Sequence, residues 1–212
     1  MGDPKIVSDA LNDSWRPLIG DRNWSMASLR RRRKDWPVGD TRLRDELLER
    51  MNRDQEVRTG IPRGATWTDE QIAEFDAVDA RNAAFLKRVI ARYGWPGRDL
   101  VGEEAAHAAW LLAQHADQDV AFQRECLPLL EKAAAAGQAT WADYAYLVDR
   151  VCVAAGSPQV YGTQYGMRDG QLEFQPIEDL DHLDERRARV GLEPHAEYDR
   201  LHRECYASPD SI

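Results

Sequence analysis

The chain has 212 residues, of which 43% are hydrophobic and 31% charged, and its formal net charge is −9. This length suits one domain or slightly more, and the composition predicts a packed globular core. No apolar run approaches the roughly 20 residues that span a bilayer, which excludes a membrane-spanning helix. The three cysteines are widely spaced, and the first ten residues lack the apolar segment of a secretion signal. We therefore expect a cytoplasmic protein with reduced thiols.

Charge is unevenly distributed along the chain. Residues 1–40 carry eight Lys/Arg and six Asp/Glu, a net +2, which leaves −11 for the remainder. An acidic body repels phosphate backbones, so we expect no nucleic-acid binding by the main part of the chain. The basic run Arg30–Lys34 is the exception, because it can contact nucleic acid or an acidic partner. A solvated arm, or a clamp onto the acidic body, is the simpler interpretation.

The first helices are predicted from hydrophobic spacing and capping residues. Residues 1–39 contain scattered tryptophans without a sustained period, which predicts an irregular N-terminal arm. Helical spacing over residues 40–58 predicts the first helix. A second helix is predicted over residues 68–93, because Thr68–Gln71 matches a capping box. Asn82 falls on the apolar stripe of this helix, so its amide needs a partner inside the protein or in a ligand.

Three further helices follow, over residues 103–115, 119–137 and 140–156. The first has acidic residues in its first turn, which complement the helix dipole. Its alanines form a small-residue face that allows another helix to approach closely. Pro128 lies inside the second of these helices and predicts a kink or a break.

The hydrophobic period then changes from that of a helix to that of a strand. Apolar residues alternate on both sides of the turn signal Asp169-Gly170, which predicts a β-hairpin near residues 161–175. Two short helices are predicted over about residues 180–190 and 194–206. The predicted fold is therefore mainly α: a single domain over residues 40–212, with five or more helices and one small β-hairpin.

Common catalytic and cofactor motifs are absent from the sequence. There is no Gly-rich phosphate loop, Cys-x-x-Cys, His-Glu-x-x-His or Gly-x-Ser-x-Gly motif. We therefore predict no cofactor and no metal. Glu104-x-x-His107 matches one element of di-iron helix bundles, but such sites need a second copy. We interpret these two residues as the polar face of a helix.

The segment Gln114–Asp117 is the most informative polar motif. We predict that His115 lies at a helix C-terminus, where the dipole favours a charged imidazole and burial disfavours it. This balance suits proton transfer near neutral pH. Asp117 follows the helix end and can orient the ring. In the structural alternative, His115 caps its own helix and Asp117 caps the next one.

A second polar segment precedes the predicted hairpin. Residues 158–164 place amide and hydroxyl side chains around Gly162. Groups of this kind suit a small polar ligand. They equally suit a buried network that holds a loop in place, so both interpretations stay open.

Four motifs occur in a fixed order along the chain: Tyr93–Pro96, Gln114–Asp117, Tyr161–Gln164 and Pro176–Asp179. Together they resemble a family of bacterial, mainly actinobacterial, proteins that is defined only as a domain of unknown function. The resemblance covers about residues 42–200 and implies no established activity. Its pattern includes four polar residues of the helical part: Asp54, Gln55, Arg58 and Asn82. So many dispersed polar residues favour a ligand site over packing alone.

These residues lead us to expect a small-molecule enzyme with cofactor-independent acid–base chemistry, in bacterial secondary metabolism. Hydrolysis, elimination and cyclisation each fit such chemistry. Two alternatives stay open. One is a non-catalytic protein that binds a small ligand or serves as an accessory. The other is a regulatory or toxin-neutralising subunit that contacts a protein partner through its N-terminal arm.

The predicted site combines three catalytic residues with a set of polar and aromatic ligand contacts. His115 moves the proton, and Asp117 or Glu178 sets its tautomer and charge. The substrate is a small polar molecule. The residues predicted to bind it are Asp54, Gln55, Arg58, Asn82, Trp110, Gln114, Gln159, Tyr161, Thr163 and Gln164.

Overall fold

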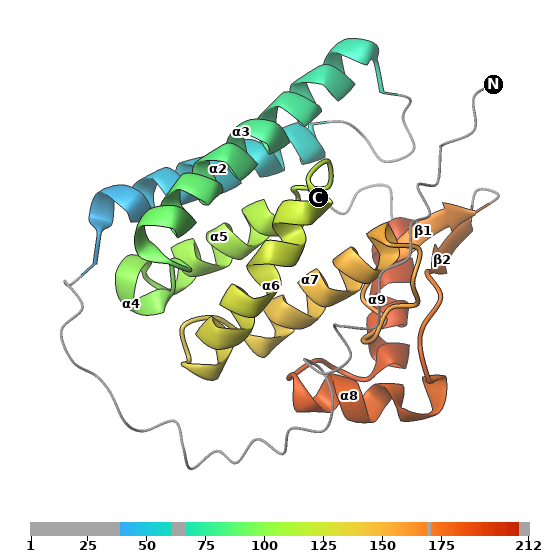
Figure 1. Cartoon of the computed structure of the whole chain (residues 1–212). Coiled ribbons are helices and arrows are strands. Elements are labelled where there is room, and N and C mark those ends of the chain that lie inside the picture. Colours follow the sequence, from blue (N-terminus) through green and yellow to red (C-terminus); the bar gives the residue numbers. More distant parts are fainter. Residues whose placement is uncertain (1–38, 61–66, 169–170, 208–212) are drawn as a thin grey trace.

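The structure, a computed structural model, describes residues 39–60, 67–168 and 171–207. Over these ranges the chain forms eight α-helices and one two-stranded antiparallel sheet, with 70% helical content (Figure 1). This confirms the mainly helical fold with a small hairpin that the sequence predicts. The basic run Arg30–Lys34 lies outside the described residues. No helix of the described part is long and apolar enough to cross a membrane.

Helices α2 (Thr41–Thr59) and α3 (Asp69–Tyr93) lie side by side (Figure 1). The side chain of Asp40 caps α2 by accepting a hydrogen bond from the Leu43 amide at 3.0 Å. Both reciprocal bonds of the predicted capping box are present at the start of α3. These caps satisfy amides that the first helical turn cannot pair internally, which fixes where each helix begins.

Besides the short helix that precedes it, helix α5 (Glu103–Gln114) contacts four other helices: α2, α3, α6 (Val120–Ala135) and α7 (Trp141–Ala154). Its alanine face is fully buried, and small side chains there let the neighbouring helices approach closely. The four-residue helix α4 (Arg98–Val101), which precedes α5, is not predicted from the sequence.

Helix α6 contains Pro128, where the sequence predicts either a kink or a break. The helix runs without interruption from Val120 to Ala135, so the predicted break does not occur. A proline removes one backbone donor from a helix. Phe122, Cys126 and Leu130 are all buried on one face of α6, and this packing holds the helix together on both sides of Pro128.

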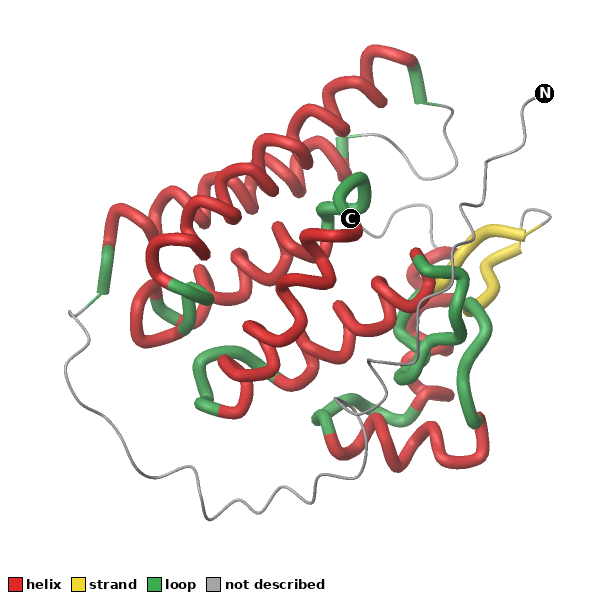
Figure 2. Tube along the Cα trace, in the orientation of Figure 1, coloured by secondary structure: helices red, strands yellow, loops and turns green. Residues whose placement is uncertain are grey.

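The C-terminal part contains the strands β1 (Tyr165–Arg168) and β2 (Gln171–Phe174). Figure 2 shows these strands next to the loops that follow α7. The hairpin is shorter than predicted, because residues 161–164 form no strand. The turn signal Asp169-Gly170 lies outside the described residues. The last helical elements are η3 (Leu180–His182), α8 (Leu183–Arg189) and α9 (His195–Ala207).

Candidate functional site

The C-terminal end of α5 brings His115 against α2. His115 Nδ1 lies 2.8 Å from Oδ2 and 3.0 Å from Oδ1 of Asp54. The Asp54 side chain is fully buried, whereas His115 keeps 15% of its side-chain surface exposed. An ionised carboxylate can only accept, so Nδ1 carries the hydrogen and a neutral ring offers Nε2 as a proton acceptor. Nε2 makes no hydrogen bond to any described residue.

Asp54 is held by two neighbours on its own helix. Gln55 Nε2 and Arg58 Nε donate to Asp54 Oδ2 at 2.8 and 3.1 Å. Arg58 also reaches α3, where its Nη2 donates to Asp79 Oδ1 at 2.6 Å. Asp79, Arg58, Asp54 and His115 thus form a continuous chain of charged contacts, here called the His115 network. It links α3, α2 and α5.

The two carboxyl groups of the His115 network differ in pKa. Burial raises the pKa of Asp54, but the hydrogen bonds and charges of His115 and Arg58 outweigh burial and hold it below its ordinary value. Burial raises the pKa of Asp79 to about 6, although Arg58 opposes the shift. At neutral pH Asp54 is therefore ionised, and its charge favours the geometry in which Nδ1 of His115 donates.

A second polar cluster lies on the other side of the α5 terminus and is centred on Arg150 of α7. Its Nε and Nη2 donate to the two carboxylate oxygens of Asp117 at 2.8 and 2.9 Å. Its Nη1 donates to Gln164 Oε1 at 3.0 Å. The backbone oxygen of Gln114 accepts from Arg150 Nε at 3.3 Å, and the side-chain Oε1 of Gln114 is buried without a hydrogen bond. Arg150 thus joins three residues that the sequence predicts to share a site.

Residues 159–164 are held by Asp149, a fully buried carboxylate on α7. It accepts from the backbone amides of Val160, Tyr161 and Thr163 at 2.7–2.9 Å, and from the Thr163 hydroxyl at 2.9 Å. The Thr163 hydroxyl in turn accepts from Gln164 Nε2 at 2.9 Å. This arrangement is the loop-holding network that the sequence leaves open as an alternative to ligand binding.

Gln159 completes that loop network with its side-chain amide. Its Oε1 accepts from the Gln164 amide, and its Nε2 donates to the backbone oxygens of Gln164 and Gln175. Gly162 has a positive φ of 66°, and a Cβ there would lie 2.8 Å from Cδ2 of His195. The loop therefore needs glycine at this position both for its backbone conformation and for its contact with α9.

Several predicted site residues lie apart from the two clusters. Glu178 is exposed, and its contact with the loop is made by its backbone amide, which donates to the Gln159 oxygen at 2.8 Å. Trp110 and Tyr161 are buried in the hydrophobic core. The sequence assigns the orientation of His115 to Asp117 or Glu178, whereas the residue in contact with Nδ1 is Asp54.

Four residues of these clusters are not among the predicted site residues: Asp79, Gln123, Asp149 and Arg150. Gln123 is fully buried and donates from Nε2 to the Gln114 oxygen at 3.1 Å and to Asp117 Oδ1 at 3.2 Å. Asp149 follows the apolar pair Leu147-Val148 on the inward face of its helix. The sequence singles out Asn82 because it is a polar residue on an apolar stripe. The same criterion would have singled out Asp149.

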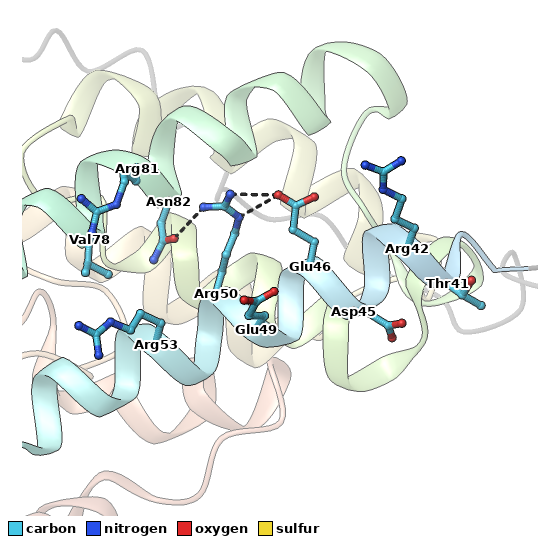
Figure 3. A pocket seen from close by; sticks show the side chains of 10 residues that line it. All are labelled: Thr41, Arg42, Asp45, Glu46, Glu49, Arg50, Arg53, Val78, Arg81 and Asn82. Carbon is cyan, nitrogen blue, oxygen red and sulfur yellow. Dashed lines mark hydrogen bonds and ion pairs between the residues drawn. The ribbon is translucent and has the colours of Figure 1, made fainter.

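A groove of about 650 Å³ lies between α2 and α3 (Figure 3). Asn82 lines it, and its Oδ1 accepts from Arg50 Nη1 at 3.4 Å. His115, Gln164 and Glu178 do not line this groove or the adjoining groove on α2. The residues around the larger groove are Thr41, Arg42, Asp45, Glu46, Glu49, Arg50, Arg53, Val78, Arg81 and Asn82.

The fold and these contacts define a mainly helical protein with a histidine–carboxylate pair at the end of its central helix. The chain belongs to the Family of unknown function (DUF6624), whose model matches residues 41–209. This confirms the resemblance to a domain of unknown function. No curated protein and no solved structure gives a significant match. Within the described residues, no group of three or more His, Cys, Asp or Glu side chains is arranged to hold a metal ion.

Proposed function

We propose that this protein is a small-molecule enzyme in which His115 acts as a general base without a cofactor. One observation carries the proposal: the buried carboxylate of Asp54 lies 2.8 Å from His115 Nδ1, while Nε2 has no partner among the described residues. A carboxylate in this position fixes the tautomer and stabilises the imidazolium that forms when Nε2 takes a proton. Asp54 acts as the positioning residue, and His115 touches the substrate.

The polar groups at the end of α5 support substrate binding next to His115. Gln114 is adjacent in the chain, and its buried Oε1 is an acceptor without a partner. Arg150 Nη1 and Gln164 Oε1, which bond to each other near the same terminus, are a further donor and acceptor that a ligand can engage. We propose that these three side chains hold a small polar molecule from which Nε2 removes a proton. Elimination and cyclisation begin with such a step, whereas in hydrolysis Nε2 takes the proton from the attacking water. The catalytic roles of Asp117 and Glu178 stay predictions.

The resemblance to bacterial, mainly actinobacterial, proteins makes secondary metabolism the setting that we propose. The test incubates the purified full-length protein with a metabolite extract and follows depletion and product formation by untargeted mass spectrometry. His115→Gln preserves approximate size but removes the titrating group. We expect a metabolite that wild type consumes to be turned over about 10²–10⁴-fold more slowly by this variant.

The matched control is His182→Gln, because His182 also faces an aspartate, Asp179, but its side chain is 62% exposed. This variant should keep wild-type turnover. Equal turnover by His115→Gln and wild type would contradict the proposal. Metabolite binding without any turnover would instead support a non-catalytic ligand-binding or accessory protein.

A further inference from the structure

The groove between α2 and α3 contains charges that the protein itself does not neutralise. Arg50 pairs with Glu46 at 3.0 Å, and Asp45 pairs with Arg44 at 2.8 Å outside the groove. Arg81 makes no ion pair or hydrogen bond with any described residue, and the same holds for Glu49 on the α2 side of the groove. The remaining lining cations are Arg42, which is also unpaired within the described ranges, and Arg53, which pairs with Glu56 and Glu74.

Asn82 supplies the second observation, which concerns hydrogen bonding and not charge. The residue is only 4% exposed, and its Nδ2 is buried without a hydrogen-bond partner. Its Oδ1 is already used by Arg50, so the unmet group is a donor. A buried donor without an acceptor destabilises the protein. A ligand that relieves this cost must therefore present an acceptor oxygen.

We propose that this groove binds the oxyanion of a small molecule, a carboxylate or a phosphate, at its Asn82–Arg81 end. Asn82 Nδ2 donates to the anion, and the guanidinium of Arg81 on the same helix neutralises it. Figure 3 shows these two residues side by side, with Arg50 next to them. The groove volume of about 650 Å³ falls in the range of about 300–1,000 Å³ that small-molecule sites occupy.

Arg50 lies beside Asn82 and can add a second donor to a bound anion. Its contact with Asn82 Oδ1 is 3.4 Å long, beyond the usual 2.7–3.2 Å for an N–H···O bond, and is weak. Nη1 of Arg50 can therefore exchange Asn82 Oδ1 for an incoming anion while Nε and Nη2 keep their contacts with Glu46. Charge-assisted bonds to an oxyanion are about twice as strong as neutral ones, which favours this exchange.

Glu49 determines where in the groove the anion lies. Its carboxylate has no compensating partner in the described part of the chain, so it repels an anion from the α2 side of the groove. Glu46 and Asp45 repel less, because each is already paired with an arginine. The oxyanion is therefore held at the Asn82–Arg81 end. This proposal is independent of the general-base function of His115, because His115 does not line the groove.

The experiment titrates the ¹⁵N-labelled full-length protein with inorganic phosphate and, separately, with succinate, and uses sodium chloride at matched ionic strength as the reference. The side-chain amide signal of Asn82 is assigned by its absence in Asn82→Asp. A saturable shift of this signal with either anion supports the proposal. Succinate alone identifies a carboxylate ligand, phosphate alone a phosphorylated one, and both together a general oxyanion site.

The variants test the direction of each electrostatic effect. Arg81→Gln should weaken binding about threefold to tenfold, and Glu49→Gln should strengthen it about twofold or more, because these changes remove an attraction and a repulsion. Asn82→Asp has nearly the same shape but no amide donor, and should weaken binding more than about tenfold. The charge-matched control Arg189→Gln, whose side chain on α8 is 73% exposed, should change nothing.

Two results would overturn the proposal. One is that neither anion gives a saturable shift of the Asn82 signal at concentrations up to about 10 mM. A dissociation constant above this value would mean little specific affinity. The other is an equal effect of Arg81→Gln and Arg189→Gln, which would indicate a general response to net charge. Arg81 and Glu49 are exposed side chains, so these variants test the proposal even if Asn82→Asp does not fold.

Discussion

Arg58 serves two buried carboxyl groups at once, and the two respond differently. Its Nε contacts Asp54 and its Nη2 contacts Asp79, but only Asp54 also faces His115. Burial raises the pKa of Asp54, yet with two partners this pKa ends below its ordinary value. Asp79 has only Arg58 as a partner, and burial raises the pKa of Asp79 to about 6. The His115 network is therefore sensitive to pH at its Asp79 end.

Replacement of Asp79 tests this sensitivity. The unfolded carboxyl loses its proton near pH 3.8 and the folded one near pH 6, so the folded state binds more protons in between. The contribution of Asp79 to the free energy of unfolding therefore falls as pH rises from about 4 to about 6, by at most about 3 kcal/mol. Asp79→Asn removes this slope and still accepts from Arg58. We expect it to raise the free energy of unfolding at pH 7, measured by urea denaturation at a series of pH values.

The control for this series is Asp76→Asn, which changes a carboxyl group on the same helix that makes no hydrogen bond or ion pair with a described side chain. The difference in slope between wild type and Asp79→Asn should be absent for this control. An unchanged slope in Asp79→Asn would show that Asp79 does not titrate in this range.

At the residue scale, the sequence indicates which polar residues are buried more reliably than it indicates their hydrogen-bond partners. The polar position of Asn82 on an apolar stripe predicts its burial, which the structure confirms. The partner of His115 could not be predicted, because Asp54 is 61 residues away in the chain and only the packing of α2 against α5 joins them. The family pattern includes Asp54, but it does not show that Asp54 contacts His115.

At the scale of single elements, local signals predict where the helices begin. Thr68 and Thr140 both start their helices with reciprocal capping bonds. The sequence misses α4 because four residues cannot establish a helical period. It overstates the hairpin because residues 161–164 alternate like a strand, whereas the amides of Tyr161 and Thr163 bond to the Asp149 carboxyl group instead of a second strand.

The two capping threonines offer a matched pair of variants. Thr140 accepts from the Asp143 amide at 2.9 Å and starts a helix with eight buried residues, whereas Thr68 is exposed and accepts from the Gln71 amide at 3.2 Å. Loss of an N-cap typically costs about 0.5–2 kcal/mol. We expect the loss in free energy of unfolding, measured by urea denaturation, to lie near the upper limit for Thr140→Ala and near the lower limit for Thr68→Ala. The reverse order would mean that the burial of a helix does not determine the value of its cap.

At the scale of the whole molecule, residues 1–38 are predicted to be dispensable for folding of the remainder. The first helix of the described part has its own cap in Asp40, and the family match begins at residue 41. A chain that starts at residue 39 should therefore melt within about 4 °C of the full-length protein, a shift equivalent to about 1 kcal/mol. Thermal circular dichroism measures this difference.

A slightly longer deletion provides the contrast. A chain that starts at residue 44 also lacks the Asp40 cap and the buried Leu43, and it should melt at a clearly lower temperature. If the shorter deletion already yields an aggregated or unfolded product, the arm contributes to the core. In that case its tryptophans and basic run become part of the folding unit and are not available to a protein partner.

The carboxylate of Asp149 has a consequence for how the molecule opens locally. Residues 160–163 belong to no helix or strand, yet their amides bond a side chain that is anchored in α7. Burial raises the pKa of the Asp149 carboxyl group, and these donors oppose that shift. Their release would leave a buried polar group without partners, which costs about 1–3 kcal/mol. We therefore expect these amides to exchange with solvent more slowly than those of a surface loop, so an irregular stretch of chain shares part of the protection of the helical core.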